Sequence, residues 1–276
     1  MGRLPDGRAV FIPFVIPGEL VRIELVSERK RYAHARVVEV LEPHPERKNP
    51  RCRHFCLCGG CHYQHLPYES QLEVKREVLL EQMTRLGRLE IPPVEEVIGS
   101  PPWNYRNYLQ FHLSQAGKLG FVEQAGDQVF QLEECHLPLP EINTLWPQLE
   151  FTPETPVERI GVRAGADQDL QIILEGDLSD PPGMVVEELP VSVVLTQADQ
   201  QQVLAGSPEL QIEVAGRIFR VSAGAFFQVN PVVAGKMISH LLDMLPWNPK
   251  WTVWEIYSGG GLFSAFLAPR VGHMVC

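Results

Sequence analysis

Residues 253–261 have the sequence VWEIYSGGG, an apolar run that ends in three consecutive glycines. A strand that enters a glycine turn and then a helix is typical of open α/β sheets, where ligands bind at the carboxyl ends of the strands. The dinucleotide fingerprint needs another glycine three residues after Gly261, but Ser264 stands there. We therefore expect a buried strand over 251–257 and a helix that starts near Leu262. The same turn could also close without any ligand.

A helix and a series of strands are expected upstream of this turn. Asn230 is suited to cap a helix whose first residue is Pro231, because proline fits that position and asparagine accepts a hydrogen bond from a free amide. Apolar residues follow on this helix at Val233, Met237, Leu241 and Leu245. Between about Tyr105 and Ile212, short apolar runs bounded by turn residues predict strands. The runs are 109–113, 128–132, 157–162, 170–174 and 191–195.

The first 43 residues are expected to form short strands joined by tight turns. Over 21–25 and 32–41 apolar and polar residues alternate, which is the period of a half-buried strand. In the second run Ala33, Ala35 and Val37 lie on one face, and His34 and Arg36 lie on the other. With a strand over 10–16, the pattern suggests a small barrel of the oligonucleotide-binding type that is one or two strands short. We expect the missing strands to precede Met1, so Met1 is not expected to be the natural start.

A helix is expected over 66–88, after the first strands. Its apolar stripe is formed by Leu72, Leu79, Met83 and Leu86. Gly87 and then Pro92-Pro93 are expected to end it.

Composition and charge limit the class of protein. The 276 residues are 45% apolar and 21% charged, which is ordinary globular usage. No apolar run is long enough to predict a transmembrane helix, and no secretory leader is visible, so we expect a cytoplasmic protein without a membrane partner. The net charge of −10 argues against a general polyanion binder. Residues 1–60 nevertheless hold 11 basic against 7 acidic residues, which fits either a local basic surface or an ordinary solvated face.

Four of the six cysteines lie within ten residues, at Cys52, Cys56, Cys58 and Cys61. Gly59 and Gly60 allow a tight turn between the last two, so that both sulfurs can face one centre. Thiolates this close suit a soft metal, either structural zinc or an iron–sulfur cluster, whereas free buried thiols are the alternative. The spacing lacks the two paired-cysteine knuckles of most zinc sites and favours iron–sulfur. His54, His62 and His65 are expected on the loop surface rather than as ligands.

Together, the cysteine spacing and the glycine turn resemble the RNA (uracil-5-)-methyltransferases, specifically the iron–sulfur branch that acts on 23S ribosomal RNA. The resemblance covers essentially the whole chain. Its most specific part is Cys-x5-Cys-x2-Cys with a distant fourth cysteine, which 51–65 and 134–137 match. The other matching segments are 7–19 for the family's TRAM barrel, 105–107 and 119–121 for its central domain, 226–231 for the start of its catalytic domain and 255–261 for its first S-adenosylmethionine (SAM) motif.

This resemblance implies a multi-domain β and α/β protein. An OB-like TRAM barrel would occupy 1–43, and a mainly β central domain with the iron–sulfur site would occupy 44–215, with the helix over 66–88 packing on the catalytic domain. The beginning of a Rossmann-like SAM methyltransferase domain would occupy 216–276. The partner would be RNA, ribosomal rather than transfer RNA, and the protein is assumed to be a monomer.

The resemblance also assigns roles to single residues. A 4Fe–4S cluster would be held by Cys52, Cys58, Cys61 and Cys135, with Cys56 as a bystander. The SAM site would include Gln228, Tyr257 and Gly259. Phe226 would contact the target uridine, which must leave the base stack before its ring can react. The basic residues expected to contact phosphates are Arg29, Lys30, Arg31, Arg47 and Lys48.

The family reaction needs residues that this sequence does not show. A cysteine thiolate attacks C6 of uracil, C5 takes the methyl group of SAM, and a base then removes the C5 proton. In the family the nucleophile and the base lie far downstream of the first SAM motif, and Cys276 is too early to be that nucleophile. We therefore expect a fragment, shortened at its C-terminus and also before Met1, that does not itself transfer methyl groups. The alternative is an RNA-binding module with structural zinc or iron–sulfur and no catalysis. A weaker alternative is a nucleotide-dependent oxidoreductase.

Overall fold

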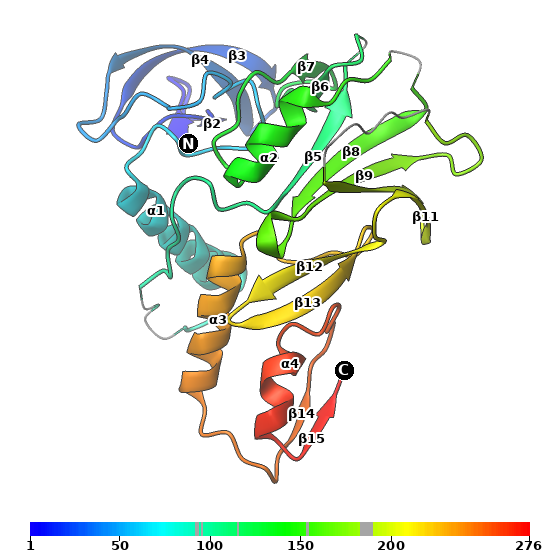
Figure 1. The fold of residues 1–276 in the computed structure, drawn as a ribbon. Coiled ribbons are helices and arrows are strands. Elements are labelled where there is room, and N and C mark those ends of the chain that lie inside the picture. Colours follow the sequence, from blue (N-terminus) through cyan, green and yellow to red (C-terminus); the bar gives the residue numbers. More distant parts are fainter. Residues whose placement is uncertain (92–93, 95, 115, 153–154, 183–189) are drawn as a thin grey trace. The chain divides into compact units, whose positions relative to one another are not determined.

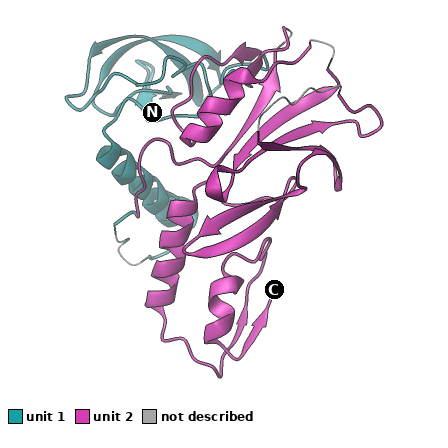
Figure 2. Cartoon of the chain, viewed as in Figure 1, with its two compact units in different colours: residues 1–97, 122–128 teal, residues 98–121, 129–276 magenta. Residues whose placement is uncertain are grey.

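The computed structural model describes residues 1–276 except 92–93, 95, 115, 153–154 and 183–189. The chain divides into two compact units (Figure 2). Unit 1 comprises 1–97 and 122–128, and unit 2 comprises 98–121 and 129–276. Both contain sheets and helices, so the fold is of the mixed α/β class. The three domains expected over 1–43, 44–215 and 216–276 remain a prediction.

Unit 1 contains a four-stranded sheet of order β1-β2-β4-β3 (Figure 1). The inward face of β4 carries Ala33 and Ala35, which pack on Val10 of β2 and form a small core, as the alternation predicted. The first expected strand is shorter than predicted, because Phe14 has a φ of 62° that breaks extended structure. The strands are β1 (Gly2–Arg3), β2 (Ala9–Phe11), β3 (Leu20–Glu28) and β4 (Tyr32–Glu42).

The helix expected over 66–88 is present as α1 (Tyr68–Glu81), which continues as a π-helical turn, η1 (Gln82–Leu86). Gly87 follows directly, as expected, whereas Pro92-Pro93 lies outside the described residues. None of the helical residues is buried, and Leu79 and Leu86 are largely exposed. Of the predicted apolar stripe, Leu72 is therefore partly buried and the other three residues are exposed.

Unit 2 is built on a seven-stranded sheet of order β11-β10-β9-β8-β5-β6-β7. Strands β9 and β10 are parallel, and the pairs β8–β9, β5–β8 and β10–β11 are antiparallel. All five predicted runs are strands, whereas β6 and β11 were not anticipated. The strands are β5 (Tyr108–Leu113), β6 (Leu119–Val122), β7 (Val129–Gln131), β8 (Val157–Ala164), β9 (Leu170–Gly176), β10 (Val191–Gln197) and β11 (Gln200–Ala205).

Both faces of this sheet are covered. On one face Phe111 and Leu174 join the large core with Trp146, which lies beyond α2 (Pro140–Leu145) in η2 (Trp146–Gln148). On the other face Ile173 and Val194 pack against Ala223. The central strands are therefore buried on both sides, which explains why they are continuously apolar rather than alternating. A short turn, η3 (Ala166–Gln168), joins β8 to β9.

A hairpin and a helix follow the sheet. The hairpin consists of β12 (Glu209–Val214) and β13 (Arg217–Ser222), and the helix α3 spans Pro231–Met244. Asn230 caps α3 as predicted, since its side chain accepts a hydrogen bond from the Val233 amide at 3.1 Å. The buried face of α3 carries Ala234 and Ile238, whereas Met237 is 43% exposed. The predicted apolar positions are thus offset from the face that packs on β12.

The last elements are β14 (Thr252–Trp254), α4 (Ser264–Leu267), η4 (Ala268–Arg270) and β15 (His273–Val275). Strands β14 and β15 are parallel, as a strand–turn–helix–strand unit requires. The expected strand over 251–257 is shorter than predicted, and the helix begins two residues after Leu262.

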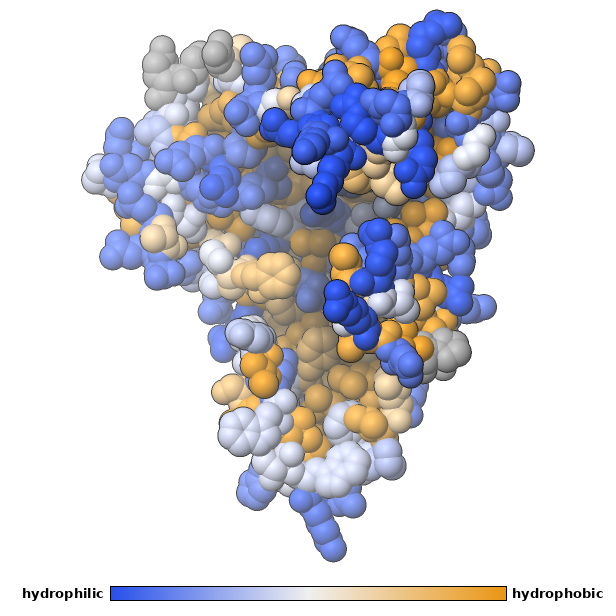
Figure 3. Space-filling view, turned by 180° about the vertical axis from the view of Figure 1, so that it is seen from behind, coloured by the Kyte–Doolittle hydropathy of each residue, from blue (hydrophilic) through white to orange (hydrophobic). Residues whose placement is uncertain are grey.

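The expectation of a buried strand before the glycine turn is wrong for the described residues. Trp254 is 71% exposed and Ile256 is 76% exposed, because β15 is the sole described strand beside β14. Apolar residues gather over these C-terminal elements, in the lower half of the space-filling view (Figure 3). Among the described helices, none has the length and apolar character that a bilayer span requires.

Candidate functional site

The segment 226–228 is held in place by a buried arginine of the sheet. Arg163 of β8 is 5% exposed, and its guanidinium donates hydrogen bonds to the carbonyls of Ser222 at 3.0 Å and Ala225 at 2.9 Å. It also lies 4.9 Å from the centre of the Tyr108 ring. Burial lowers the pKa of Arg163, but a guanidinium stays charged at neutral pH. No carboxylate pairs with it among the described residues, so the two carbonyls and the ring face compensate this buried charge.

The glycine turn has backbone conformations that side chains disfavour. Gly259 has a φ of 53° and Gly261 a φ of 69°, which glycine adopts without steric cost. Tyr257 has a φ of 64° and a fully exposed side chain. Glu255 accepts a hydrogen bond from the Ser264 hydroxyl, and its amide donates to the Val275 carbonyl at 2.9 Å. These bonds fix the turn between β14, β15 and α4.

The structure brings these two segments together. A Cβ placed on Gly260 would lie 3.7 Å from a ring carbon of Phe227, so the turn packs on the segment that contains Gln228. Phe227 is buried with Val214, Ile238 and Phe266 in the core shared by the hairpin, α3 and α4. On either side of this anchor Phe226 is 78% exposed, and Gln228 is half-buried. Exposed rings, an amide and open glycine backbone thus lie around one buried phenylalanine.

The cysteine loop belongs to unit 1 and carries three half-buried thiols, at Cys52, Cys58 and Cys61. The Gly60 amide donates to the Cys58 sulfur at 3.3 Å, and a Cβ on Gly60 would lie 3.4 Å from that sulfur. Burial raises the pKa of the Cys58 thiol, and the neighbouring Cys61 raises it further. The loop therefore has partly shielded sulfurs and an amide directed at one of them, which suits a soft metal centre.

The remaining cysteines occupy other environments. Cys56 is exposed, with a φ of 74°. Cys135 is half-buried in unit 2, where its carbonyl accepts a hydrogen bond from the Asn143 side chain at 2.9 Å. The described residues contain no group of three or more histidine, cysteine or acidic side chains that is arranged to hold a metal ion. His54 and His65 are buried rather than on the loop surface as expected. The His65 ring packs against Phe55, which in turn packs against Phe14.

The basic residues of unit 1 have different neighbours. Arg29, Lys30 and Arg31 are exposed in the β3–β4 turn and form no ion pair with any residue the structure describes. Arg47 instead binds Glu19, whose side chain has no exposed surface. The predicted phosphate contact of Arg47 is therefore revised, because its charge is already neutralised inside the protein.

Hydrogen bonds converge on the Glu19 carboxylate. Arg47 donates at 2.7 Å, and the amides of Ile16 and His44 donate at 2.8 and 3.1 Å. Burial alone would raise the pKa of Glu19, but these hydrogen bonds outweigh it and lower the pKa to about 2. Sequence reasoning missed both this pair and Arg163, since a buried charge has no periodic signature in a sequence.

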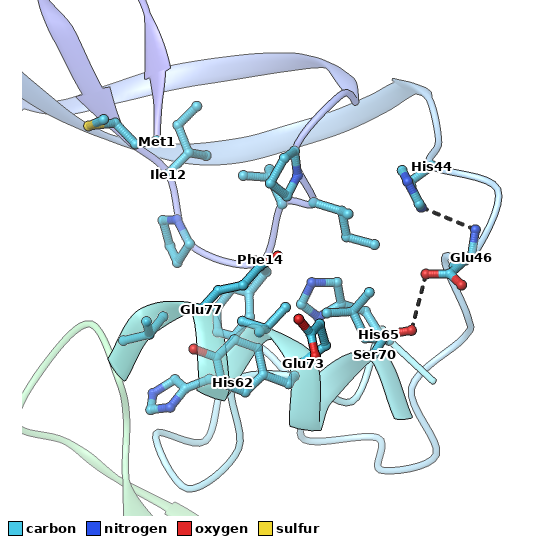
Figure 4. Close-up of a pocket in the computed structure, with 18 of the residues that line it drawn as sticks. Met1, Ile12, Phe14, His44, Glu46, His62, His65, Ser70, Glu73 and Glu77 are labelled. Atoms are coloured by element: carbon cyan, nitrogen blue, oxygen red, sulfur yellow. Dashed lines mark hydrogen bonds between the residues drawn. The ribbon is translucent and has the colours of Figure 1, made fainter. Parts of the chain in front are cut away.

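A groove of about 1150 Å³ lies within unit 1, between the loop that follows β2 and the helix α1 (Figure 4). Its helix side carries Glu69, Glu73, Glu77 and Glu81, and Glu46 lies at its rim, where it accepts a hydrogen bond from Ser70. A surface so rich in carboxylates repels the phosphates of a nucleic acid. Phosphate binding by unit 1 is therefore favoured on its other surfaces.

No family model matches the chain. It is 29% identical to an uncharacterized RNA methyltransferase of Thermosynechococcus vestitus, over 100% of this chain and 68% of that protein. It is 32% identical to the 23S rRNA (uracil(1939)-C(5))-methyltransferase RlmD of Nitrosococcus oceani, over 95% of this chain and 63% of that protein. An uncharacterized RNA methyltransferase of Aquifex aeolicus is 30% identical, over 96% of this chain and 65% of that protein.

The fold is similar to a solved structure of Pyrococcus abyssi tRNA (uracil-54, C5)-methyltransferase in complex with S-adenosyl-L-homocysteine. The TM-score is 0.66 at 19% sequence identity, and the match covers 98% of this chain and 69% of that one. The chain thus spans about two thirds of the length of the curated relatives that it matches.

Proposed function

The chain belongs to the RNA uracil-C5 methyltransferase family, and we propose that it carries the RNA-binding part and the first SAM-binding elements of such an enzyme. The observation that carries this proposal is the contact between Phe227 and Gly260. It joins two motifs that lie about 30 residues apart in the sequence and that the family resemblance assigns to one cofactor site. Sequence proximity alone does not bring them together.

In this proposal, SAM supplies the methyl group and the residues around Phe227 hold the cofactor. Gln228 offers an amide to the cofactor, Tyr257 offers an exposed ring, and Gly259 gives access to backbone amides. Phe226, exposed beside them, contacts the extruded uridine. These residues are assigned to binding, and no nucleophile or base is named among them.

A cofactor-binding measurement tests this site. We expect S-adenosyl-L-homocysteine to bind the chain in isothermal titration calorimetry, and Gly259→Val to abolish the binding heat. A β-branched side chain is strained at a φ of 53°, so the turn must change its backbone. Gly224→Ala is the control, because Gly224 has open space around its Cα and no positive φ. Equal binding by wild type and Gly259→Val would refute this site.

We also propose that the cysteine loop holds a 4Fe–4S cluster with Cys52, Cys58, Cys61 and Cys135 as ligands. The half-buried thiols and the amide at Cys58 support it. Such a cluster stabilises the loop and, depending on its potential, can exchange an electron. The likeness to 23S rRNA methyltransferases such as RlmD favours ribosomal RNA as the substrate. We expect a cytoplasmic monomer whose first four strands form the TRAM barrel.

Metal analysis tests the cluster. Anaerobically purified protein is expected to contain about four irons and four acid-labile sulfides per chain. Cys58→Ser and Cys61→Ser should lose most of both, while Cys56→Ser should keep them because Cys56 lies outside the ligand pattern. About one zinc and no sulfide would instead support the alternative of an RNA-binding module with a structural zinc site.

A further inference from the structure

Three aromatic rings form a cluster on the outer face of the unit 1 sheet. The rings of Phe11 and His34 are stacked, with centroids 5.5 Å apart and an interplanar angle of 29°. Tyr32 meets Phe11 edge-on at 5.9 Å and His34 at 5.5 Å. The cluster is open to solvent, since Phe11 is 44% exposed, Tyr32 is 39% exposed and His34 is also exposed.

The strand register explains why these rings lie together and outside the core. Phe11 of β2 pairs with His34 of β4. Along β4 the inward positions are Ala33 and Ala35, so Tyr32 and His34 share the outer face. The core of this sheet therefore forms without the rings. Adjacent apolar side chains that stay exposed in a folded protein are a mark of interaction sites.

The charge next to the rings is positive and uncompensated. Arg29, Lys30 and Arg31 directly precede Tyr32 in the chain and form no ion pair with a described residue. Three other arginines of this sheet are paired, and Arg3 of β1 donates a hydrogen bond to the Gly7 carbonyl at 3.1 Å. Arg8 pairs with Asp6 at 2.7 Å and with Glu28 at 2.9 Å, and Arg36 pairs with Glu24. The free positive charge is thus concentrated at the end of β4 where the rings lie.

We propose that Phe11, Tyr32 and His34 form a stacking platform for unpaired RNA bases, with Arg29, Lys30 and Arg31 binding the phosphates on either side. Aromatic faces beside a basic turn are the features by which proteins bind single-stranded nucleic acids, because every base can stack and every nucleotide carries a phosphate. The proposal rests on the proposed function in taking RNA as the substrate. It adds that unit 1 binds a single-stranded segment of this RNA through the outer face of its sheet.

The acidic groove of the same unit supports this assignment, because it is a surface of unit 1 on which RNA is not expected to bind. The carboxylates of Glu69, Glu73 and Glu77 line the groove beside α1, and they would repel the backbone of the same RNA. Within unit 1, the basic turn 29–31 and the exposed rings beside it therefore mark one surface for RNA, and the α1 groove is unsuited to it.

Fluorescence anisotropy with a labelled single-stranded RNA of about 12 nucleotides tests the platform, with a duplex RNA of equal length as the comparison probe. Wild type should bind the single strand more tightly than the duplex. The double variant Phe11→Ala, Tyr32→Ala should lose about 10-fold to 100-fold in affinity for the single strand. The same pair changed to leucine keeps apolar area without ring faces, and should lose nearly as much.

Two further variants separate stacking from charge and from general surface effects. The triple variant Arg29→Ala, Lys30→Ala, Arg31→Ala should weaken binding and reduce its salt dependence, whereas the ring variants should leave the salt dependence unchanged. Leu41→Ala is the matched control, since Leu41 lies on β4 and is 44% exposed without belonging to the cluster. It should bind as wild type does.

The outcomes distinguish failure of the platform from failure of the proposed function. If the ring variants bind RNA as wild type does, the platform is wrong, while the cofactor site of unit 2 is untouched. If wild type binds S-adenosyl-L-homocysteine but shows no preference for the single strand, the platform is again wrong. If wild type binds neither RNA nor the cofactor analogue, the proposed function itself fails.

Discussion

Arg163→Ala is expected to lower the free energy of unfolding of unit 2 by about 3–5 kcal/mol. The substitution removes two charge-assisted hydrogen bonds, and it leaves the Ala225 carbonyl without this donor and the Ser222 carbonyl with the Ala225 amide at 3.1 Å. It also leaves a cavity against the Tyr108 ring, because Arg163 is 5% exposed. Each loss is of the kind that produces large destabilisation.

Arg163→Lys separates the charge of this side chain from its shape. One ammonium cannot reproduce the planar fork that spans two carbonyls, and it is more strongly hydrated than a guanidinium. We therefore expect a loss of about 2–3 kcal/mol despite the retained charge. Because the two carbonyls lead directly into 226–228, this variant should also bind S-adenosyl-L-homocysteine more weakly at temperatures where it is folded.

Urea unfolding followed by tryptophan fluorescence measures these losses. The five tryptophans all lie in unit 2, at Trp103, Trp146, Trp247, Trp251 and Trp254, so the signal reports that unit. Arg159→Ala is the matched control on the same strand. The Arg159 side chain is 47% exposed and pairs with Glu175 at 3.5 Å. Its replacement should therefore lower the free energy of unfolding by less than about 1 kcal/mol. Equal stability of Arg163→Ala and Arg159→Ala would show that the buried guanidinium is not structural.

Glu19→Gln is expected to destabilise unit 1 by about 3 kcal/mol at pH 7. The change leaves Arg47 without its negative partner, and it turns an acceptor of several hydrogen bonds into an amide that also donates. Glu24→Gln is the control, because the pair of Glu24 with Arg36 is exposed and should contribute less than about 1 kcal/mol.

The contribution of Glu19 should depend on pH in one direction. Its pKa is about 2 in the folded chain and near 4.5 when it is unpaired. Above pH 4.5 the carboxylate is ionised in both states and its stabilisation is complete. As the pH falls from 4.5 towards 2, the unfolded state binds the proton first, so the stabilisation is lost. The gap between wild type and Glu19→Gln should therefore shrink at pH 3.

A probe confined to unit 1 is needed for this measurement. The amide signals of Ala33 and Ala35, followed by nuclear magnetic resonance with alanine labelled by nitrogen-15, report the small core of the unit 1 sheet during urea unfolding. A gap between wild type and Glu19→Gln that stays constant from pH 7 to pH 3 would contradict the lowered pKa. Equal effects of Glu19→Gln and Glu24→Gln would contradict the importance of burial.

Local patterns in the sequence predicted most of the secondary structure. The period of two on β4 identified the inward Ala33 and Ala35, and Asn230-Pro231 identified the start of α3. The apolar runs of the large sheet became β5, β7, β8, β9 and β10. These succeeded because strand alternation, helix caps and glycine turns depend on neighbours a few residues away. The cysteine spacing and the glycine turn also led to the uracil-C5 methyltransferases, in agreement with the relatives, whereas the iron–sulfur branch stays a prediction.

The interactions between distant segments were decided only by the tertiary structure. The strand before the glycine turn was expected to be buried, but burial depends on which strands lie beside β14, and a sequence window does not contain that information. The contact of Phe227 with Gly260 joins segments that no local pattern pairs.

The basic residues show most clearly that interactions between distant segments cannot be predicted from local sequence. Arg47 and Arg163 look like Arg29 and Arg31 in the sequence, yet folding pairs the first with Glu19, buries the second against two carbonyls and leaves the others in solvent. The sequence by itself determined the elements and the family. The tertiary structure decided which charges stay exposed and unpaired, because the energy of a charge depends on the solvent and partners around it.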